Sequence, residues 1–414
     1  MLILSIIVPV LLGFGILLVK EWKSRTLLLS VTGAALAVTA ALGLGVVFGA
    51  EAELFLFSFG KNLDFYLRVD TLGRLFALVL DVVWLLSGFY AFEYMKHEQE
   101  EKRFFGFFVM VFGVLHALAF SGSMVTFYLF YELMTLLSVP LILHSRSKDA
   151  IKGGLKYLFY SLFGAYMVLF GLFFLNRFAQ SFTFQPGGTL NMAAVAGNEG
   201  LMLVVAFSMI LGFSVKAGMF PLHAWLPTAH PVAPAPASAV MSGIIVKMGV
   251  LGMIRVVYYL IGADFLRGTW VQTTWMSLSL VTVFMGSMLA YREKVMKKRL
   301  AYSTVSQASY ILFGLSLLQP QAMTGALTSG IDVFSWLGPV VLLTSALLTA
   351  GYLLPITVNG FLPGADYDYD ALEKKEPCMT MLLPLLILAA LAVVLGIFPN
   401  PLTAYISEIA AGVL

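Results

Sequence analysis

The sequence is poor in charged residues and has no long polar segment. Only 11% of its 414 residues are Asp, Glu, Lys or Arg, whereas soluble domains contain about 25%. The longest stretches between its apolar runs are 50–71, 177–200 and 359–379, and at about twenty residues each they are too short for a separate soluble domain. A glycine-rich phosphate-binding loop is also missing. These absences exclude ATP-driven transport within the chain.

Cysteine is almost absent. The single Cys378 lies in a polar segment, so one chain supplies neither a disulfide framework nor a thiolate site for zinc or an iron–sulfur cluster. We therefore expect no catalytic or redox centre and no cofactor in this chain. Whether it serves as a subunit of an enzyme complex stays open. The net charge of +3 gives no reason to expect a nucleic-acid partner.

Apolar residues are abundant: they make up 60% of the sequence, and the mean hydropathy is +0.92. They occur in blocks long enough for a helix to cross a bilayer, which takes about 20 residues, and strand-like alternation is absent. The first block lacks the basic start and the cleavage site of a signal peptide, so we expect a retained span. The prediction is an all-α, polytopic helical bundle forming one membrane domain, 1–414. Its twelve expected spans are 2–19, 27–49, 72–92, 104–121, 123–143, 157–176, 201–220, 237–262, 272–290, 301–319, 337–358 and 380–399.

Basic residues predict how these spans are oriented. With the N-terminus outside, the inner loops hold seventeen Lys and Arg residues and the outer segments hold five. Because inner loops are enriched in Lys and Arg, we expect both termini outside. The expected location is a cell (inner) membrane.

Charged and ionisable side chains within the expected spans are the strongest functional signal, because such groups are costly in a bilayer unless they face protein or water. Glu132, Lys216 and Lys247 lie at similar depth on three spans. Moving a carboxylate toward or away from a buried lysine would favour its protonated or its neutral form, which suits proton transfer. The alternatives are a static buried ion pair, or a Lys216 side chain that reaches toward the interface.

Three further groups are weaker candidates. A lone His116 on an apolar helix is either a hydrogen-bonded core residue or a relay. Asp81 is expected to pair with a basic group on a neighbouring helix or to support proton transfer. Arg255, near a span end, is expected to serve packing or an internal salt bridge.

The segment 220–237, FPLHAWLPTAHPVAPAPA, contains five prolines. Proline breaks helices, and irregular backbone at membrane depth survives only where it is buried in protein or lines a wet cavity. His223 and His230 lie in this break, where an imidazole could pass protons between water and the lysines. Helix capping or loop hydrogen bonding is the alternative.

The inner turn YREKVMKKRLAYSTVSQASY carries basic residues and then small polar ones, among them Ser303 and Ser306. A polar helix start could form a water-filled entry path, and we count both serines as candidate supporting residues. It could equally anchor the topology and make interhelical hydrogen bonds.

These motifs resemble the antiporter-like membrane subunits shared by respiratory complex I, Mrp-type sodium/proton antiporters and membrane-bound hydrogenases. The match rests on FYLFYELMTLLSVPLI, on VKAGMFPLHAWLPTAHPVAPAPASAVMSGIIVKMGV and on KKRLAYSTVSQASYILFGL. The resemblance implies two inverted five-helix repeats, each with a broken helix. It also implies that Glu132 and Lys216 form a coupled pair, that Lys247 is the next proton carrier, and that the partners are other membrane subunits, the lipid bilayer, protons and sodium.

The chain departs from this family in its second half. The segment SLLQPQAMTGALTSGIDVFSWLGPVVLL runs almost directly into a later family helix, so about two spans are missing between Gln319 and Asp332, and with them the lysine of the second repeat. The expected divisions are 1–103 for the N-terminal helices, 104–262 for the first repeat, 272–358 for the truncated second repeat and 380–414 for the C-terminal helix. Three functions remain open: a conducting subunit of a larger complex, a non-conducting structural subunit, and a stand-alone transporter of an organic solute.

Overall fold

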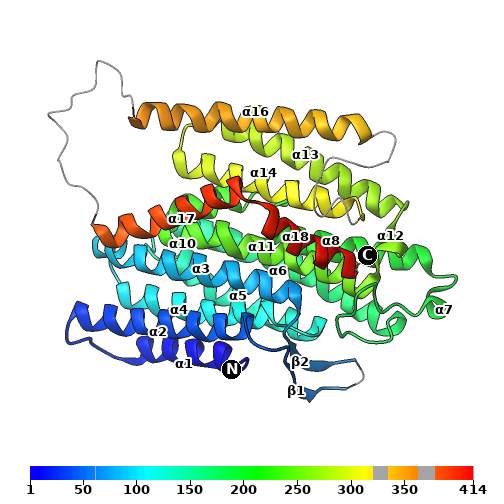
Figure 1. Ribbon diagram of the computed structural model, residues 1–414, viewed down its shortest axis with the longest axis horizontal. Helices are drawn as coiled ribbons and strands as arrows, with labels where there is room; N and C mark the ends of the chain where they lie inside the picture. The colour runs from blue at the N-terminus through cyan, green and yellow to red at the C-terminus, as the bar shows by residue number, and fades with distance from the viewer. Residues whose placement is uncertain (61, 320–333, 362–377, 414) are drawn as a thin grey trace.

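The apolar blocks of the sequence form long helices that lie side by side along one axis of a helical bundle (Figure 1). The computed structural model describes residues 1–60, 62–319, 334–361 and 378–413. Ten helical stretches within these ranges are long and apolar enough to cross a membrane. The main helices are α1 (Leu4–Leu18), α2 (Arg25–Val47), α3 (Thr71–Tyr94), α4 (Glu101–Ala119), α5 (Met124–Ile142), α6 (Lys148–Phe178), α8 (Glu199–Ala217), α13 (Trp270–Arg292), α14 (Met296–Ser316), α16 (Phe334–Phe361) and α17 (Met379–Ile397).

Every one of the twelve expected spans is a helix, which confirms the predicted all-α polytopic bundle. Two of the twelve expected spans are not among the ten helical stretches that are long and apolar enough to cross a membrane. Helix α1 has only 15 residues, fewer than the roughly 20 that cross a bilayer at right angles. Helix α14 begins with the basic residues of the inner turn and is too polar to qualify. The predicted junction between Gln319 and Asp332 lies almost wholly outside the described residues.

A β-hairpin and a separate last helix lie outside the twelve spans expected from the sequence. Segment 50–71 contains an antiparallel hairpin of β1 (Glu53–Ser58) and β2 (Asp64–Arg68). The expectation that strand-like alternation is absent was therefore wrong here, since ELFLFS does alternate in exposure. After α17 the chain continues into α18 (Asn400–Val413), which runs on toward the end of the bundle opposite the start of α17 (Figure 1). The Tyr405 hydroxyl of α18 donates to the Thr71 carbonyl at 3.2 Å.

The predicted helix break lies between α8 and the next span. Helix α8 ends at Gly218, whose positive φ of 78° suits glycine, and a Cβ there would lie 2.3 Å from Leu226. The short helices α9 (Leu226–Val232) and α10 (Ala235–Val240) follow. The span 235–261 then continues through a π-helical turn, α11 (Val246–Ile254) and a second π-helical segment.

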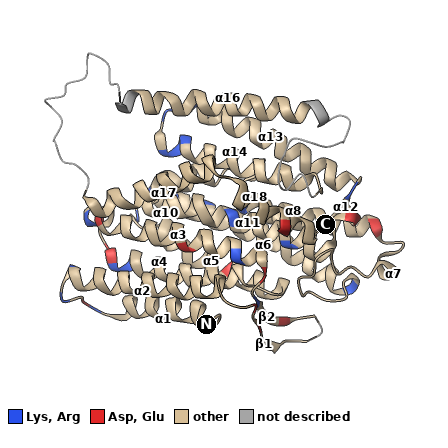
Figure 2. Cartoon of the chain, viewed as in Figure 1, with Lys and Arg blue, Asp and Glu red and all other residues tan. Residues whose placement is uncertain are grey.

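The broken span lies at the centre of the bundle. In its most apolar window, 94% of Ala235–Ile261 is buried inside the protein, against 6% of Met379–Ile397 in α17. Figure 2 shows helices that are mostly free of charge, with many of the charged residues near helix ends and a few within the bundle. Residues that would be costly in lipid are therefore placed where protein surrounds them.

Candidate functional site

Lys216 lies at the C-terminal end of α8, one residue before the break begins, and is fully buried. Its Nζ atom donates three hydrogen bonds, to the hydroxyls of Thr135 on α5 (2.9 Å) and of Tyr157 (2.8 Å) and Ser161 (2.8 Å) on α6. It also lies 4.1 Å from the centre of the Tyr157 ring. We call Thr135, Tyr157 and Ser161 the hydroxyl cage.

The hydroxyl cage suits both protonation states of Lys216. An ammonium group has three N–H donors and no acceptor, and the three hydroxyls accept all three. A neutral amine has one lone pair, and a hydroxyl can turn its O–H to donate to it. The Tyr157 hydroxyl also lies 2.7 Å from the Ser138 hydroxyl, which extends the network by one group. The site can therefore release and regain a proton without leaving a polar group unpaired.

Glu132 lies on α5, three residues before Thr135, and positions three apart share one face of a helix. Its Oε1 atom is buried without a hydrogen-bond partner. Among the described residues, no ion pair within 4.0 Å joins Glu132 to Lys216. The lysine is instead held by neutral hydroxyls, and the expected coupling of the two residues stays a prediction.

Lys247 is the second residue of α11 in the broken span, and the π-helical turn Met241–Ile245 directly precedes this helix. Its Nζ donates to the Ser242 carbonyl at 2.7 Å. The Ser242 hydroxyl lies 2.6 Å from the Thr304 hydroxyl on α14. Single π turns inside α-helices occur often at functional sites. Lys247 is thus joined by one serine to the second half of the chain.

The two histidines of the break have different surroundings. His230 is buried, and its Nδ1 lies 2.8 Å from the Ser238 hydroxyl, while its Nε2 has no hydrogen-bond partner among the residues that the structure describes. His223 is half-buried, and its Nδ1 has no partner. Both histidines therefore have a buried ring nitrogen available for a further hydrogen bond.

Asp81 and His116 form a separate buried pair away from the hydroxyl cage. Asp81 on α3 and His116 on α4 are joined by a 2.9 Å contact between Oδ1 and Nε2. This confirms the expected partner for Asp81 on a neighbouring helix.

Arg255 makes the internal salt bridge that the sequence suggested. Both of its terminal nitrogens donate to Asp70, the N-cap residue of α3. Its guanidinium carbon also lies 4.8 Å from the centre of the Tyr259 ring. Burial by itself raises the pKa of the Asp70 carboxyl, but the Arg255 charge and hydrogen bonds hold that pKa below its usual range. The pair ties the N-terminal helices to the broken span.

The two serines expected near an entry path belong to hydroxyl networks. Ser306 is buried, 2.8 Å from the Ser287 hydroxyl on α13, and it donates to the Val283 carbonyl at 3.0 Å. Ser345 of α16 contacts both serines. We call Ser287, Ser306 and Ser345 the serine cluster. Ser303 instead accepts from the Tyr352 hydroxyl at 2.8 Å.

The hydroxyl cage was missed in the sequence, as was the role of Ser242. Two spacings were available as signals: Thr135 follows Glu132 by three residues, and Ser161 follows Tyr157 by four, so each pair shares a helix face. Neither spacing shows that α5, α6 and α8 meet.

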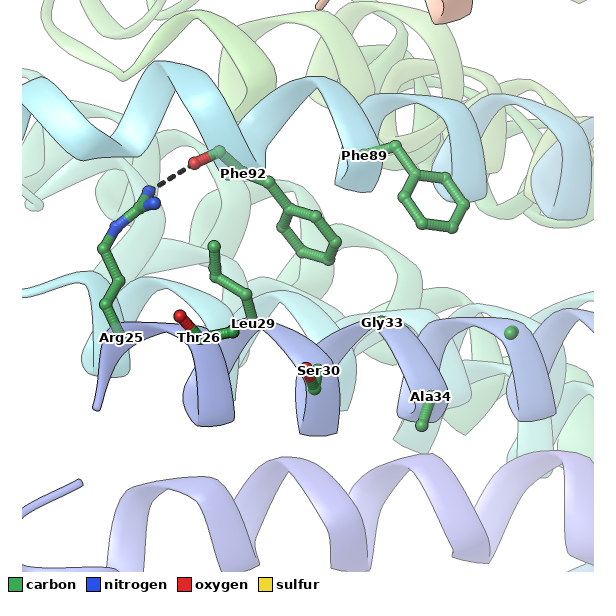
Figure 3. Close-up of a pocket in the computed structure, with 9 residues that line it drawn as sticks. Arg25, Thr26, Leu29, Ser30, Gly33, Ala34, Phe89 and Phe92 are labelled. Carbon is green, nitrogen blue, oxygen red and sulfur yellow. Dashed lines mark hydrogen bonds between the residues drawn. The ribbon is translucent and has the colours of Figure 1, made fainter. Parts of the chain in front are cut away.

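The larger surface grooves lie away from these residues. One groove of about 540 Å³ lies between α2 and α3, lined by Leu29, Gly33, Phe89 and Phe92 with Arg25 at its end (Figure 3). Another of about 900 Å³ is lined mostly by apolar residues of α5 and α6. Neither groove is lined by Glu132, Lys216 or Lys247. They give no support to a solute site at the buried charges.

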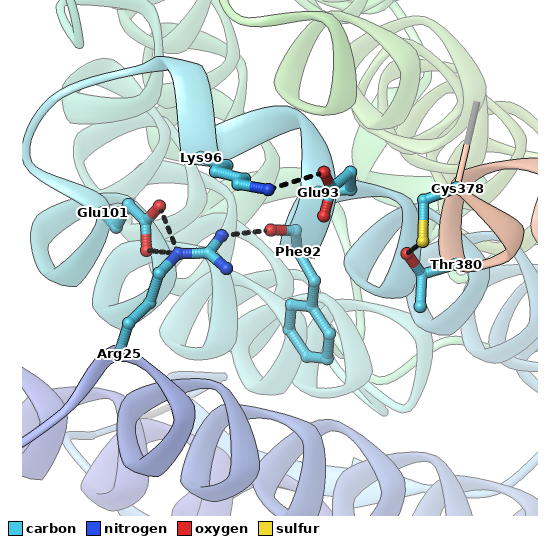
Figure 4. Close-up of polar contacts among 7 residues, drawn as sticks. All are labelled: Arg25, Phe92, Glu93, Lys96, Glu101, Cys378 and Thr380. Atoms are coloured by element: carbon cyan, nitrogen blue, oxygen red, sulfur yellow. Dashed lines mark hydrogen bonds and ion pairs between the residues drawn. The ribbon is translucent and has the colours of Figure 1, made fainter. Parts of the chain in front are cut away.

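Polar contacts close the bundle end beside the first groove (Figure 4). Arg25 donates through Nε to both carboxylate oxygens of Glu101, at 2.9 and 3.0 Å, and through Nη2 to the Phe92 carbonyl at 2.5 Å. Lys96 donates to Glu93 at 3.4 Å. Exposed ion pairs of this kind contribute little to stability, so we assign them to local positioning of the α2, α3 and α4 ends.

Comparison with known proteins identifies the family. The profile described as NADH:quinone oxidoreductase/Mrp antiporter, transmembrane, matches residues 121–389, and the N-terminal profile of complex I chain 5 matches residues 56–105. Because the first match covers more than half of the chain, the chain belongs to this family. It is a multi-pass membrane protein.

The chain is similar to several curated proteins but shorter than they are. It is 32% identical to hydrogenase-4 component B of Escherichia coli K12, over 62% of this chain and 39% of that protein. It is 25% identical to a Na(+)/H(+) antiporter subunit of Alkalihalophilus pseudofirmus, over 78% of this chain and 65% of that one. The chain thus spans between two fifths and two thirds of these relatives' lengths.

Solved structures share the fold. A chain of the Mrp complex from Dietzia sp. DQ12-45-1b superposes with a TM-score of 0.78 at 17% identity, over 100% of this chain and 97% of that one. A chain of respiratory complex I from Thermus thermophilus gives a TM-score of 0.70 at 18% identity, over 100% of both chains. At these identities the likeness shows the fold alone.

Proposed function

We propose that the chain translocates protons across a membrane as one subunit of a multi-subunit complex of the Mrp, complex I or hydrogenase type. The observation that carries this proposal is the fully buried Lys216 in the hydroxyl cage. A cation buried only to stabilise the fold would be expected beside a carboxylate. A set of hydroxyls that accepts from an ammonium and donates to an amine is suited to a changing charge.

In the proposed mechanism Glu132, Lys216 and Lys247 are successive proton carriers. Approach of the Glu132 carboxylate would favour the protonated form of Lys216, and its withdrawal would favour release of the proton. The free ring nitrogens of His223 and His230 lie in the break between the two lysines and would accept or donate along the way. Ser303 and Ser306 on α14, with Asp81 and His116, are proposed as supporting groups.

The carriers are not joined by a continuous chain of hydrogen bonds in the described residues. Lys216 reaches only the hydroxyl cage, and Lys247 reaches only Ser242. Transfer between them would need bridging water or a shift of the broken helix, whose irregular backbone suits either. We propose both termini on the outer side of a cell (inner) membrane, following the distribution of basic residues.

The second candidate is a non-conducting structural subunit of the same kind of complex. It is favoured by the serine cluster, which occupies the second half of the described chain without a charged side chain beside it. On this view the truncated second repeat, 272–358, provides no exit for protons, and the chain serves the assembly of its complex.

Ion flux in membranes that carry the complete native complex separates the two candidates. Glu132→Gln and Lys247→Ala are compared with wild type, and Lys152→Ala serves as control because Lys152 is an exposed lysine on α6. We expect both test variants to lose proton uptake and the control to retain it. Uptake measured with and without sodium shows which ion is coupled. Unchanged uptake in both test variants, with normal assembly, would favour the structural role.

A further inference from the structure

The Asp81–His116 pair joins α3 to α4, and in the described part of the chain no hydrogen bond or ion pair links it to the hydroxyl cage. Both side chains are almost fully buried, with 1% and 0% of their surfaces exposed. His116 Nε2 lies 2.9 Å from Asp81 Oδ1, and His116 Nδ1 lies 3.1 Å from the Phe112 carbonyl. Asp81 Oδ2 has no hydrogen-bond partner in the described part of the chain.

The contact with Phe112 decides where the imidazole protons lie. A backbone carbonyl only accepts hydrogen bonds, so His116 Nδ1 carries a hydrogen and donates it. The remaining proton then lies on the line between Nε2 and the Asp81 carboxyl. It is either on the oxygen, giving a neutral acid beside a neutral imidazole, or on the nitrogen, giving a carboxylate beside an imidazolium.

Both arrangements contain one shared proton and have no net charge. Removing that proton leaves a net negative charge, and adding another leaves a net positive charge. Among the described residues, no other ion pair reaches either group. An uncompensated buried charge is costly, so burial favours the arrangements with a single shared proton.

The helices packed against the pair offer no nearby compensating charge. Arg74, the nearest charged residue on α3, is seven positions from Asp81, about 10 Å along the helix, and it donates to the Gly49 carbonyl at 2.9 Å. Helices α1, α10 and α17 have no ionisable side chain. The others carry Arg25 on α2; Arg74, Tyr90, Glu93 and Tyr94 on α3; Lys96 and His97 on the helical turn Met95–His97 that follows α3; Glu101, Lys102 and Arg103 on α4; and Tyr128, Tyr131 and Glu132 on α5.

Gly43 of α2 closes the site from the third side. A Cβ at this position would lie 2.4 Å from both Asp81 Oδ2 and His116 Nε2, a distance that real side chains do not tolerate. The glycine thus allows α2 to pack closely against the two polar side chains.

We propose that Asp81 and His116 form a proton-binding site of their own, which holds one proton shared between Oδ1 and Nε2 and is shielded by Gly43. The site belongs to helices α2, α3 and α4 and does not depend on whether Lys216 conducts. Its ligand is a single proton.

Nitrogen NMR of histidine-labelled whole protein in lipid nanodiscs tests the proposal directly. The chain has five histidines, and a His116→Gln sample identifies the His116 signals. We expect a protonated Nδ1 and, on Nε2, the signal of a nitrogen that shares a proton with the Asp81 carboxyl. A His116 whose Nδ1 lacks a proton, or whose Nε2 shares no proton with Asp81, would overturn the proposal.

Gly43→Ala provides the matched perturbation. The added methyl would force the pair apart, so we expect the shared-proton signal of His116 Nε2 to be lost. Gly45→Ala on the same helix is the control, because its methyl would meet only the flexible end of Met1 at 3.2 Å, and it should keep the wild-type signal. A Gly43→Ala protein with an unchanged signal would contradict the assigned geometry. If that variant does not fold, the wild-type NMR spectrum by itself still tests the proposal.

Discussion

Two hydroxyl-rich regions of the bundle differ in one respect. In the first, formed by α5, α6 and α8, the hydroxyl cage surrounds the buried cation of Lys216. In the second, formed by α13, α14 and α16, the serine cluster bonds to itself and to the Val283 carbonyl. Each region buries three hydroxyls at a helix interface, but only the first encloses a group that can change its charge.

The presence of Lys216 in one region and not in the other distinguishes hydroxyls that serve helix packing from hydroxyls that serve a function. Interhelical hydroxyl contacts join helices in either region, so hydroxyls alone predict no transport. A buried lysine costs free energy that its hydroxyl partners offset only in part. Its presence in the first region therefore calls for a function, whereas the serine cluster is explained by packing.

Replacing Lys216 should have the largest effect on transport. In Lys216→Met the ion-carrying group is lost, so we expect proton uptake to fall to background, at least about tenfold below wild type. Thermal stability should not fall with it, because replacing a buried charge by an apolar side chain of similar size is often neutral or stabilising. Uptake in native-complex vesicles and thermal unfolding of the same samples measure the two effects.

Breaking the Asp70–Arg255 pair should give the largest loss of stability. Asp70→Asn keeps the helix cap but leaves Arg255 buried without its charge partner, which costs about 3–5 kcal/mol. Because the folded pKa of Asp70 is held below its usual range, this stabilisation is present at neutral pH and is lost as the pH falls through the folded pKa. Wild type should therefore lose its advantage over Asp70→Asn in acid.

Thermal unfolding of both proteins across a pH series measures this effect. Asp264→Asn is the control, because Asp264 pairs with Arg267 at an exposed site. This substitution should hardly change the stability. An advantage of wild type that persists unchanged in acid would contradict the assignment.

A smaller effect is expected from the hydroxyl cage itself. Tyr157→Phe removes one of the three acceptors of Lys216 and keeps the aromatic ring, so we expect a stability loss of about 1–3 kcal/mol. Proton uptake should be reduced but not abolished, since Thr135 and Ser161 remain. Tyr160→Phe, on the same helix and only half-buried, is the control for both assays. Equal behaviour of the two variants would mean that the cage has no special role.

The smallest effect is expected in the second region. Ser287→Ala removes one member of the serine cluster and should cost about 1 kcal/mol of stability. Uptake should stay within about twofold of wild type. A loss of uptake comparable to that of Lys216→Met would show that the serine cluster belongs to the ion path and would remove the contrast between the two regions.

The sequence predicted the features that depend on residues close together along the chain. Apolar blocks gave twelve helices, and prolines between Lys216 and Lys247 located the broken helix. It could not predict the hydroxyl cage, because Thr135, Tyr157 and Ser161 become partners of Lys216 only when α5, α6 and α8 pack together. Single hydroxyl residues on apolar helices carry no signal of that packing.

Other features escaped prediction for different physical reasons. The hairpin and α18 are short, and their formation depends on contacts such as the one from Tyr405 to Thr71. The π-helical turn before Lys247 depends on the packing of the central span, since residue types in a helix do not distinguish it from an α-helix. For the Asp81–His116 pair, the sequence suggested that Asp81 has a basic partner but could not select His116.

The most direct test of the account is proton uptake measured side by side for Lys216→Met and Ser287→Ala in vesicles that carry equal amounts of assembled native complex. We predict background uptake for Lys216→Met and near wild-type uptake for Ser287→Ala. Wild-type uptake in Lys216→Met would contradict the central claim that the lysine in the hydroxyl cage carries the proton.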